Sequence, residues 1–156
     1  MKLNLGSYTN PLPGYSNIDI EKWDDVDTIL DLNKLPYPFA SNSIEEIRAV
    51  DIIEHLGELT KVEIIKEWAR ILKPGGKLYI RTTNATGIYA FASLQHAHYF
   101  MYNSFEPSYA QPYFEVEQVW LGFGDSKRMF KINKLLREIS KYTPFIGSIA
   151  FLLKKK

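Results

Sequence analysis

The first fourteen residues restrict the fold more than any other part of the sequence. Leu3 and Leu5 alternate with polar neighbours, which indicates a short strand, and this strand runs directly into Gly6. Glycine reaches positive φ and has no Cβ, so such a strand end suits a loop whose backbone approaches a ligand, although it is also typical of an ordinary turn. Pro11-Leu12-Pro13-Gly14 follows and cannot form a helix interior. The first two strands are therefore joined without a full helix.

Length and composition predict one α/β domain spanning residues 1–156. The chain has 156 residues, of which 46% are hydrophobic and 24% charged, as in ordinary globular proteins. It has no cysteine, which excludes disulfides, thiolate zinc sites and cysteine nucleophiles. No apolar run approaches the roughly 20 residues of a membrane span, and no signal pattern precedes the first strand. We therefore expect a cytoplasmic protein.

Charge is distributed unevenly along the chain. Residues 1–62 contain five basic and eleven acidic residues, a net charge of −6, whereas residues 63–156 contain fourteen and seven, a net charge of +7. The segment from Lys127 onward is mostly basic. Such a segment attracts phosphate or a membrane surface, or it is simply the solvated face of a helix.

Periodicity predicts alternating strands and helices. One helix is expected from about Leu59 to Leu72, with Thr60 and Glu63 in the pattern of a capping box and Lys73–Gly76 ending it. Further helices are expected near Gly87–Tyr102, within a long aromatic connection over residues 83–114, and over Phe130–Tyr142. The other strands are expected over Tyr15–Ile20, Thr28–Asp31, Ile47–Val50, Lys77–Arg81, Glu115–Phe123 and Gly147–Leu153.

Four of the predicted strands end on residues that suit ligand binding: Gly6, Asp19, Asp31 and Asp51. Ligands of open α/β sheets bind at the carboxyl ends of the strands. An acid after the second strand is placed to accept hydrogen bonds from ribose hydroxyls, and a polar residue after the third can meet an adenine edge. Any one of these acids is also a common turn former, so their joint placement carries the argument.

These segments resemble the motif series of class I S-adenosylmethionine-dependent methyltransferases. The resemblance covers residues 2–82 and is closest to a small group of type-11-like members that carry a Leu-Pro-Gly turn in place of the first helix. It implies a three-layer Rossmann-like fold with a mostly parallel seven-stranded sheet, an antiparallel last strand and minimal helices on one face. The motifs are Leu3–Ser7, Asn17–Ile20, Leu30–Leu32 with Leu35–Phe39, Glu54–Leu56 and Arg70–Leu78.

The resemblance also implies S-adenosylmethionine as cofactor and assigns roles to particular residues. Gly6 and Ser7 would pass close to its methionine part, and Asp19 would hold its ribose hydroxyls. Asp31 would contact the adenine amino group. The complete set of implied cofactor-binding residues is Asn4, Gly6, Ser7, Tyr8, Asp19, Ile20, Asp31, Leu32, Asp51 and Ile52.

Tyr8 departs from the family pattern, which usually has a second glycine at that position. The tyrosine side chain can swing outward, stack on the ligand or occupy part of the site. The last arrangement would impair cofactor binding and weaken or abolish activity.

Two histidines are candidate catalytic residues. His55 follows the fourth strand at the expected mouth of the site, where it can orient substrate or act as a base, and His98 lies in the aromatic connection. Both are also interpretable as turn or lid residues. His96 and His98 are two positions apart and do not share a helix face, so no metal site is predicted.

The sequence thus predicts transfer of a methyl group from S-adenosylmethionine to a small-molecule or sugar-like acceptor, in a protein that can pair as a homodimer. One alternative is a non-catalytic binding or assembly module with this fold, in which Tyr8 closes the cofactor site. The other is a nucleic-acid methyltransferase that uses the basic helix over residues 127–141.

Overall fold

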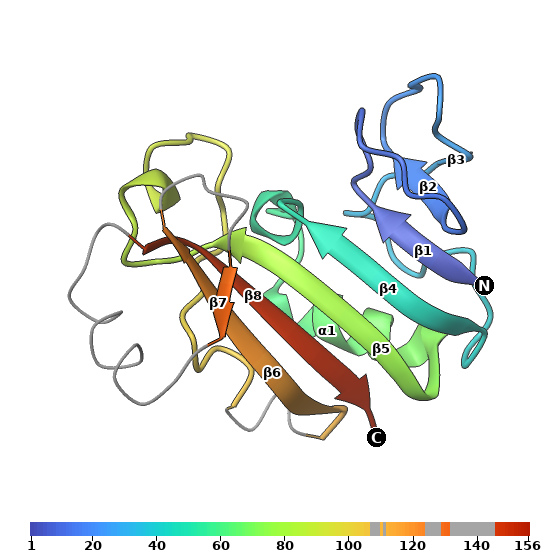
Figure 1. Ribbon diagram of the computed structural model, residues 1–156. Coiled ribbons are helices and arrows are strands. Elements are labelled where there is room, and N and C mark those ends of the chain that lie inside the picture. Colours follow the sequence, from blue (N-terminus) through green and yellow to red (C-terminus); the bar gives the residue numbers. More distant parts are fainter. Residues whose placement is uncertain (107–109, 111, 124–128, 132–145) are drawn as a thin grey trace.

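The computed structural model describes residues 1–106, 110, 112–123, 129–131 and 146–156, and these form one sheet with helical segments packed against it (Figure 1). The strands are β1 (Lys2–Leu5), β2 (Ser16–Asp19), β3 (Thr28–Ile29), β4 (Ile44–Val50), β5 (Leu72–Thr83), β6 (Phe114–Phe123), β7 (Met129–Lys131) and β8 (Ile146–Lys155). The helix α1 (Lys61–Ile71) joins β4 to β5, and short 3₁₀ turns cover Ile53–His55 and Ile88–Ala90.

The strand order is β3-β2-β1-β4-β5-β8-β6-β7. The first five strands in this order are mutually parallel, and β8 runs antiparallel to both of its neighbours, β5 and β6. The mostly parallel Rossmann-like sheet is therefore confirmed, and the described residues form eight strands instead of the seven expected. The additional strand is β7, which pairs antiparallel with β6 at the edge of the sheet.

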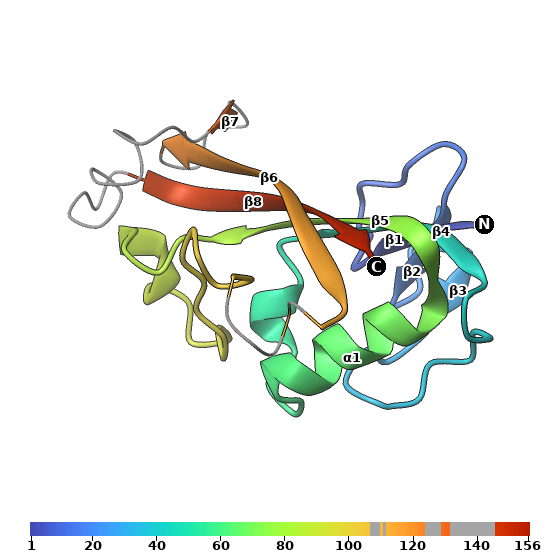
Figure 2. The ribbon, with the colours of Figure 1, turned by 90° about the horizontal axis from the view of Figure 1, so that it is seen from below.

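The two faces of the sheet differ in chemistry. Across β1, β4 and β5, the aligned residues Leu5, Ala49 and Ile80 are fully buried on the face that α1 covers (Figure 2). The neighbouring row, Asn4 followed by the half-buried Arg48 and Tyr79, points to the opposite face. The expectation of helices on one face is thus confirmed for the described residues, and the apolar core lies between the sheet and α1.

The sequence of α1 explains where it begins and how it packs. Thr60 and Glu63 form the predicted capping box, with the Glu63 backbone N–H donating to the Thr60 hydroxyl at 3.2 Å and the Thr60 N–H donating to the Glu63 carboxylate at 2.8 Å. The side chains of Ile64, Trp68 and Ile71 are fully buried. Spacings of three and four residues place these side chains on one helix face, against the apolar side of the sheet.

A buried hydrogen-bond network takes the place of a helix between β1 and β2. The Asn4 side-chain amide donates to the Asn17 side-chain oxygen at 2.9 Å and to the Asn10 backbone oxygen at 3.1 Å. The same Asn17 oxygen accepts the Leu12 N–H at 2.8 Å. Asp27 accepts the Asn17 backbone N–H at 2.7 Å. Side-chain hydrogen bonds therefore hold the Pro-rich loop against β1 and β2.

The helix predicted near Gly87–Tyr102 is wrong beyond the single 3₁₀ turn Ile88–Ala90. Its backbone groups bond to other segments instead: the N–H groups of Ala97 and His98 donate to the Glu54 carbonyl, and the Ala85 N–H donates to the Phe100 carbonyl. Tertiary contacts thus override the local preference of the sequence. The expected helix over Phe130–Tyr142 begins in a strand, since Phe130 belongs to β7, and residues 132–142 lie outside the described residues.

Replacing Thr60 by alanine should lower the free energy of unfolding by about 1 kcal/mol, because it removes the acceptor that satisfies a free N–H at the start of α1. The measurement is urea denaturation with a fitted midpoint at unchanged slope. The matched control is Thr9→Ala in an exposed loop, for which a change within about 0.5 kcal/mol is expected. Equal effects of the two substitutions would contradict a stabilising role for the capping box.

Candidate functional site

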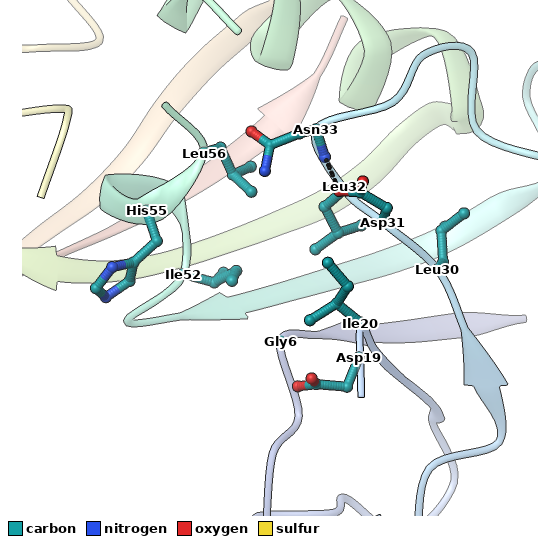
Figure 3. A pocket seen from close by; sticks show the side chains of 10 residues that line it. All are labelled: Gly6, Asp19, Ile20, Leu30, Asp31, Leu32, Asn33, Ile52, His55 and Leu56. Atoms are coloured by element: carbon teal, nitrogen blue, oxygen red, sulfur yellow. Dashed lines mark hydrogen bonds between the residues drawn. The ribbon is translucent and has the colours of Figure 1, made fainter. Parts of the chain in front are cut away.

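A cavity of about 180 Å³ lies at the carboxyl ends of β1, β2, β3 and β4. Figure 3 shows Ile20, Leu32 and Ile52 converging on its centre, with the Asp19 carboxylate beside Gly6 and His55 at the far left. The structure brings seven predicted site residues into this wall, namely Gly6, Asp19, Ile20, Asp31, Leu32, Ile52 and His55. The predicted site residues did not include three lining residues, Leu30, Asn33 and Leu56, each a direct neighbour of a predicted site residue.

A second cavity of about 650 Å³ shares Gly6 with the first and extends over the polar face of the sheet. Four further predicted residues, Asn4, Ser7, Tyr8 and Asp51, line it together with Asn10, Pro11, Leu12, Arg48, Val50 and Arg81. The Asn4 side chain already holds the loop between β1 and β2 through its hydrogen bonds, as described above. The Ser7 hydroxyl is buried and has no hydrogen-bond partner among the described residues.

Gly6 sits where the two cavities meet, and only glycine fits there. Its φ is +66°, and a Cβ added at this position would lie 2.7 Å from Cγ1 of Ile52. The backbone of β1 thus approaches the Ile52 side chain without leaving room for any other residue. The sequence pattern predicted a close approach of this backbone to a ligand, and that approach stays a prediction, because the close contact seen here is with the Ile52 side chain.

The Asp19 carboxylate is fixed by the loop that follows β1. One of its oxygens accepts the Tyr8 backbone N–H at 2.8 Å, and the other accepts the Glu21 N–H at 3.1 Å. A carboxylate has about four lone-pair positions, so each oxygen can accept one more hydrogen bond. Asp19 is therefore oriented in the cavity wall with capacity left for hydroxyl donors.

Asp31 is held in the same way on the next strand end. Its carboxylate accepts the Asn33 N–H at 3.0 Å and pairs with Lys34 at 3.3 Å. These contacts, the Asn33 backbone hydrogen bond first, lower the pKa of Asp31 below its usual value. Asp31 stays ionised near neutral pH and acts there only as a hydrogen-bond acceptor.

The Tyr8 side chain turns outward, the first of the three predicted arrangements. Its ring is 54% exposed and meets Trp23 edge to face, with 4.7 Å between the ring centroids. Tyr8 does not line the smaller cavity but does contribute to the larger one. Its backbone has φ +44°, a conformation usually taken by glycine, which accounts for the glycine expected at this position.

The structure separates the two candidate catalytic histidines. His55 is half-buried in the cavity wall, and burial followed by the neighbouring His96 lowers its pKa, so the ring is neutral at pH 7. His98 lies outside both cavity walls. Its Nε2 lies 2.9 Å from the carbonyl oxygens of Leu56 and of Leu59, and an Nε2–H that donates to both holds the loop after His55 in place. This geometry favours a positioning role for His98.

The comparisons with known proteins agree with this fold. A family model described as a methyltransferase domain matches residues 21–80, while no curated protein matches the sequence. A structure of a SAM-dependent methyltransferase from Thermotoga maritima has 14% identity and a TM-score of 0.71, covering 99% of this chain and 81% of that one. One from Archaeoglobus fulgidus has 12% identity and a TM-score of 0.63, with 99% and 85% covered. One from Methanosarcina mazei has 15% identity and a TM-score of 0.61, with 99% and 91% covered.

Gly6→Ala and Gly14→Ala form a matched pair that tests the close approach at Gly6. Both glycines have positive φ, but a Cβ at Gly14 meets nothing within 4 Å. Alanine in this conformation costs about 1–2 kcal/mol of unfolding free energy at either site. The clash with Ile52 should add about 1–3 kcal/mol at Gly6 alone. Denaturant unfolding of both variants gives the difference, and equal losses would contradict the tight contact between Gly6 and Ile52.

Proposed function

We propose that this chain, which has the class I S-adenosylmethionine-dependent methyltransferase fold, transfers a methyl group from S-adenosylmethionine to a small-molecule or sugar-like acceptor. The methyltransferase domain family implies both the activity and the cofactor. The observation that carries the proposal for this chain is the wall of the smaller cavity. It combines an oriented acid after β2, a second acid after β3 and apolar side chains between them.

The residues present fit the adenosine part of that cofactor. The two free lone-pair positions of the fixed Asp19 carboxylate match two ribose hydroxyls. Ile20, Leu32 and Ile52 offer apolar surface for a flat base, and the ionised Asp31 offers an acceptor for its amino group. This assignment follows the roles expected from the sequence.

The larger cavity suits the methionine part and the acceptor. It adjoins the smaller one at Gly6 and contains the unpartnered Ser7 hydroxyl. Its wall is polar, with Asn10, Arg48 and Asp51 among its residues, and Arg81 forms an ion pair with Asp51. A polar wall with several hydrogen-bonding groups supports a hydroxylated acceptor over an apolar one.

S-adenosylmethionine supplies a methyl group on a positively charged sulfur. A bond forms between the acceptor nucleophile and the methyl carbon, the carbon–sulfur bond breaks, and its electron pair stays on sulfur as the charge is neutralised. The chain contributes mainly by holding both reactants in line, which contributes most of the rate in such displacements. The neutral His55 ring is available to orient the acceptor or to accept its proton.

Asp19→Asn and Asp19→Ala should weaken binding of S-adenosylhomocysteine by about 10- to 100-fold, because hydrogen bonds to a charged group are worth about 1.5–3 kcal/mol. Isothermal titration calorimetry measures the affinity, and the ligand-induced rise in melting temperature provides a second readout. Asp24→Ala is the control, since Asp24 is exposed and lines neither of these two cavities.

Calorimetry on the unmodified protein decides the proposal itself. Absence of S-adenosylhomocysteine binding at millimolar ligand would overturn it and favour the non-catalytic module. Unchanged affinity for S-adenosylhomocysteine in both Asp19 variants would be compatible with the proposed cofactor. It would contradict the hydrogen bonds between Asp19 and the ribose.

Tyr8→Gly should leave the affinity for S-adenosylhomocysteine within about threefold of the original, because the Tyr8 ring lies on Trp23 and outside the smaller cavity. The same calorimetric titration measures it, with Trp23→Ala as a companion variant that removes the ring contact from the other side. A gain of tenfold or more in the glycine variant would show that Tyr8 obstructs the site.

Three further predictions from the sequence concern nucleic-acid binding, cellular location and oligomeric state. The basic 127–141 segment falls almost entirely outside the described residues, so the nucleic-acid alternative gains no support from the structure. No described helix is long and apolar enough to cross a membrane. A cytoplasmic location and a homodimer stay predictions.

A further inference from the structure

We propose that Glu54, His55 and His96 bind a first-row divalent transition metal ion beside the cofactor pocket. Each of the three residues offers one ligand atom, and these atoms lie within 4.8 Å of one another. Glu54 and His55 belong to the 3₁₀ turn after β4, whereas His96 comes from the connection after β5. The fold therefore assembles a cluster from positions 41 residues apart in the sequence.

One oxygen of the buried Glu54 carboxylate has no hydrogen bond within the described part of the chain. The residue is 1% exposed, and the oxygen is Oε2. Burial raises the pKa of Glu54 above the usual value, and this outweighs the Glu54 backbone N–H and the neighbouring Thr82 side chain, which both lower it. Buried carboxylates persist where they are paired or coordinate a cation. A metal ion would satisfy this oxygen and offset the cost of burying it.

The histidine rings are oriented as metal ligands usually are. His96 Nδ1 lies 3.0 Å from the Ala90 carbonyl oxygen, so Nδ1 carries the proton and Nε2 presents its lone pair. The Gln95 backbone also acts on the His55 ring and opposes the lowering of its pKa. A hydrogen bond from the second ring nitrogen, as in His96, fixes the tautomer and orientation of a ligating histidine. The two rings meet edge to face at 4.8 Å between centroids.

The donor set indicates the class of metal. Two imidazole nitrogens and one carboxylate oxygen suit zinc, cobalt, iron or manganese, whereas calcium and magnesium prefer all-oxygen sites. In a tetrahedral site, bonds of about 2.0–2.2 Å place the ligand atoms roughly 3.3–3.6 Å apart, so the most widely separated ligand atoms of this cluster would have to approach by about 1.2–1.5 Å. Three protein ligands leave a coordination position open, as in catalytic rather than structural sites.

The site also gives a reason for the course of the aromatic connection. The Ala97 and His98 N–H groups donate to the Glu54 carbonyl, which places His96 next to the 3₁₀ turn. His98, which the sequence pairs with His96, instead bonds to the carbonyls of Leu56 and Leu59. The absence of a metal site was expected from the spacing of His96 and His98, but the structure pairs His96 with His55.

His55 belongs to both the metal cluster and the cavity wall. Resting on the proposed function, this shared position makes an acceptor hydroxyl the natural ligand for the open coordination position. A bound cation would lower the pKa of a coordinated hydroxyl, so the acceptor would release its proton to solvent water before methyl transfer, without His55 acting as a base. The acceptor class is then one whose reactive group is a metal-binding oxygen.

The test is titration of the protein with Co²⁺, after treatment with EDTA and dialysis, followed by visible absorption and by melting temperature. One equivalent should bind with the absorption bands of a low-coordinate nitrogen and oxygen site, and Zn²⁺ should displace it. Glu54→Gln and His96→Ala should each weaken binding at least tenfold. Glu58→Gln, an exposed carboxylate on the neighbouring loop, is the control and should bind as the original does.

No binding by the original protein, or binding that survives in His96→Ala, would overturn the proposal. His96 is only half-buried, so this variant remains informative if the buried Glu54 substitution prevents folding. The titration contains no cofactor, and the S-adenosylhomocysteine calorimetry is run in EDTA. Failure of the metal site and failure of the methyltransferase proposal therefore give different results.

Discussion

The hydrogen bonds of the buried Asn4 amide hold together the part of the chain on which the pocket depends. Asn4 is 4% exposed and joins β1 to Asn17 on β2 and to Asn10 in the intervening loop. Leaving such groups unpaired in the interior would cost more than the bonds themselves contribute, so the network admits essentially one arrangement. Because this network fixes β1 against β2, Gly6 and Asp19 lie at the same edge of the sheet without a covering helix.

The two faces of the sheet therefore have different roles: one face stabilises the fold, and the other lines a cavity. The face toward α1 carries the apolar core, including Trp68, and burial of that surface is the main source of folding free energy. On the other face the side chains satisfy one another: Arg48 lies over the Tyr79 ring at 4.8 Å, and the Tyr15 hydroxyl donates to Glu46 at 2.5 Å. This polar face forms the wall of the larger cavity, where a conventional fold would place a helix.

Local patterns in the sequence predicted the features that depend on neighbouring residues, and missed those that depend on distant ones. The alternation around Leu3, the capping box at Thr60 and the acids at strand ends all appear in the structure, because each reflects backbone geometry within a few residues. The 87–102 segment has helical residue types, but its N–H groups bond to carbonyls such as that of Glu54, more than 40 positions away. The cluster of His55 with His96 is likewise a product of the tertiary fold.

Backbone strain is concentrated at the junction of the two cavities. Among the described residues, positive φ outside glycine occurs at Tyr8, Asn42 and Asp51, and the first and last of these flank Gly6 in the larger cavity. Each such conformation costs on the order of 1–3 kcal/mol and persists only where surrounding contacts determine it. The Asp19 carboxylate holds the Tyr8 N–H, and Arg81 holds the Asp51 carboxylate. Within the described part of the chain, strained non-glycine backbone thus occurs only at this junction and at the Asn42 turn. Strain maintained at the junction keeps the binding surface preformed, so that little ordering is left to oppose a ligand that enters.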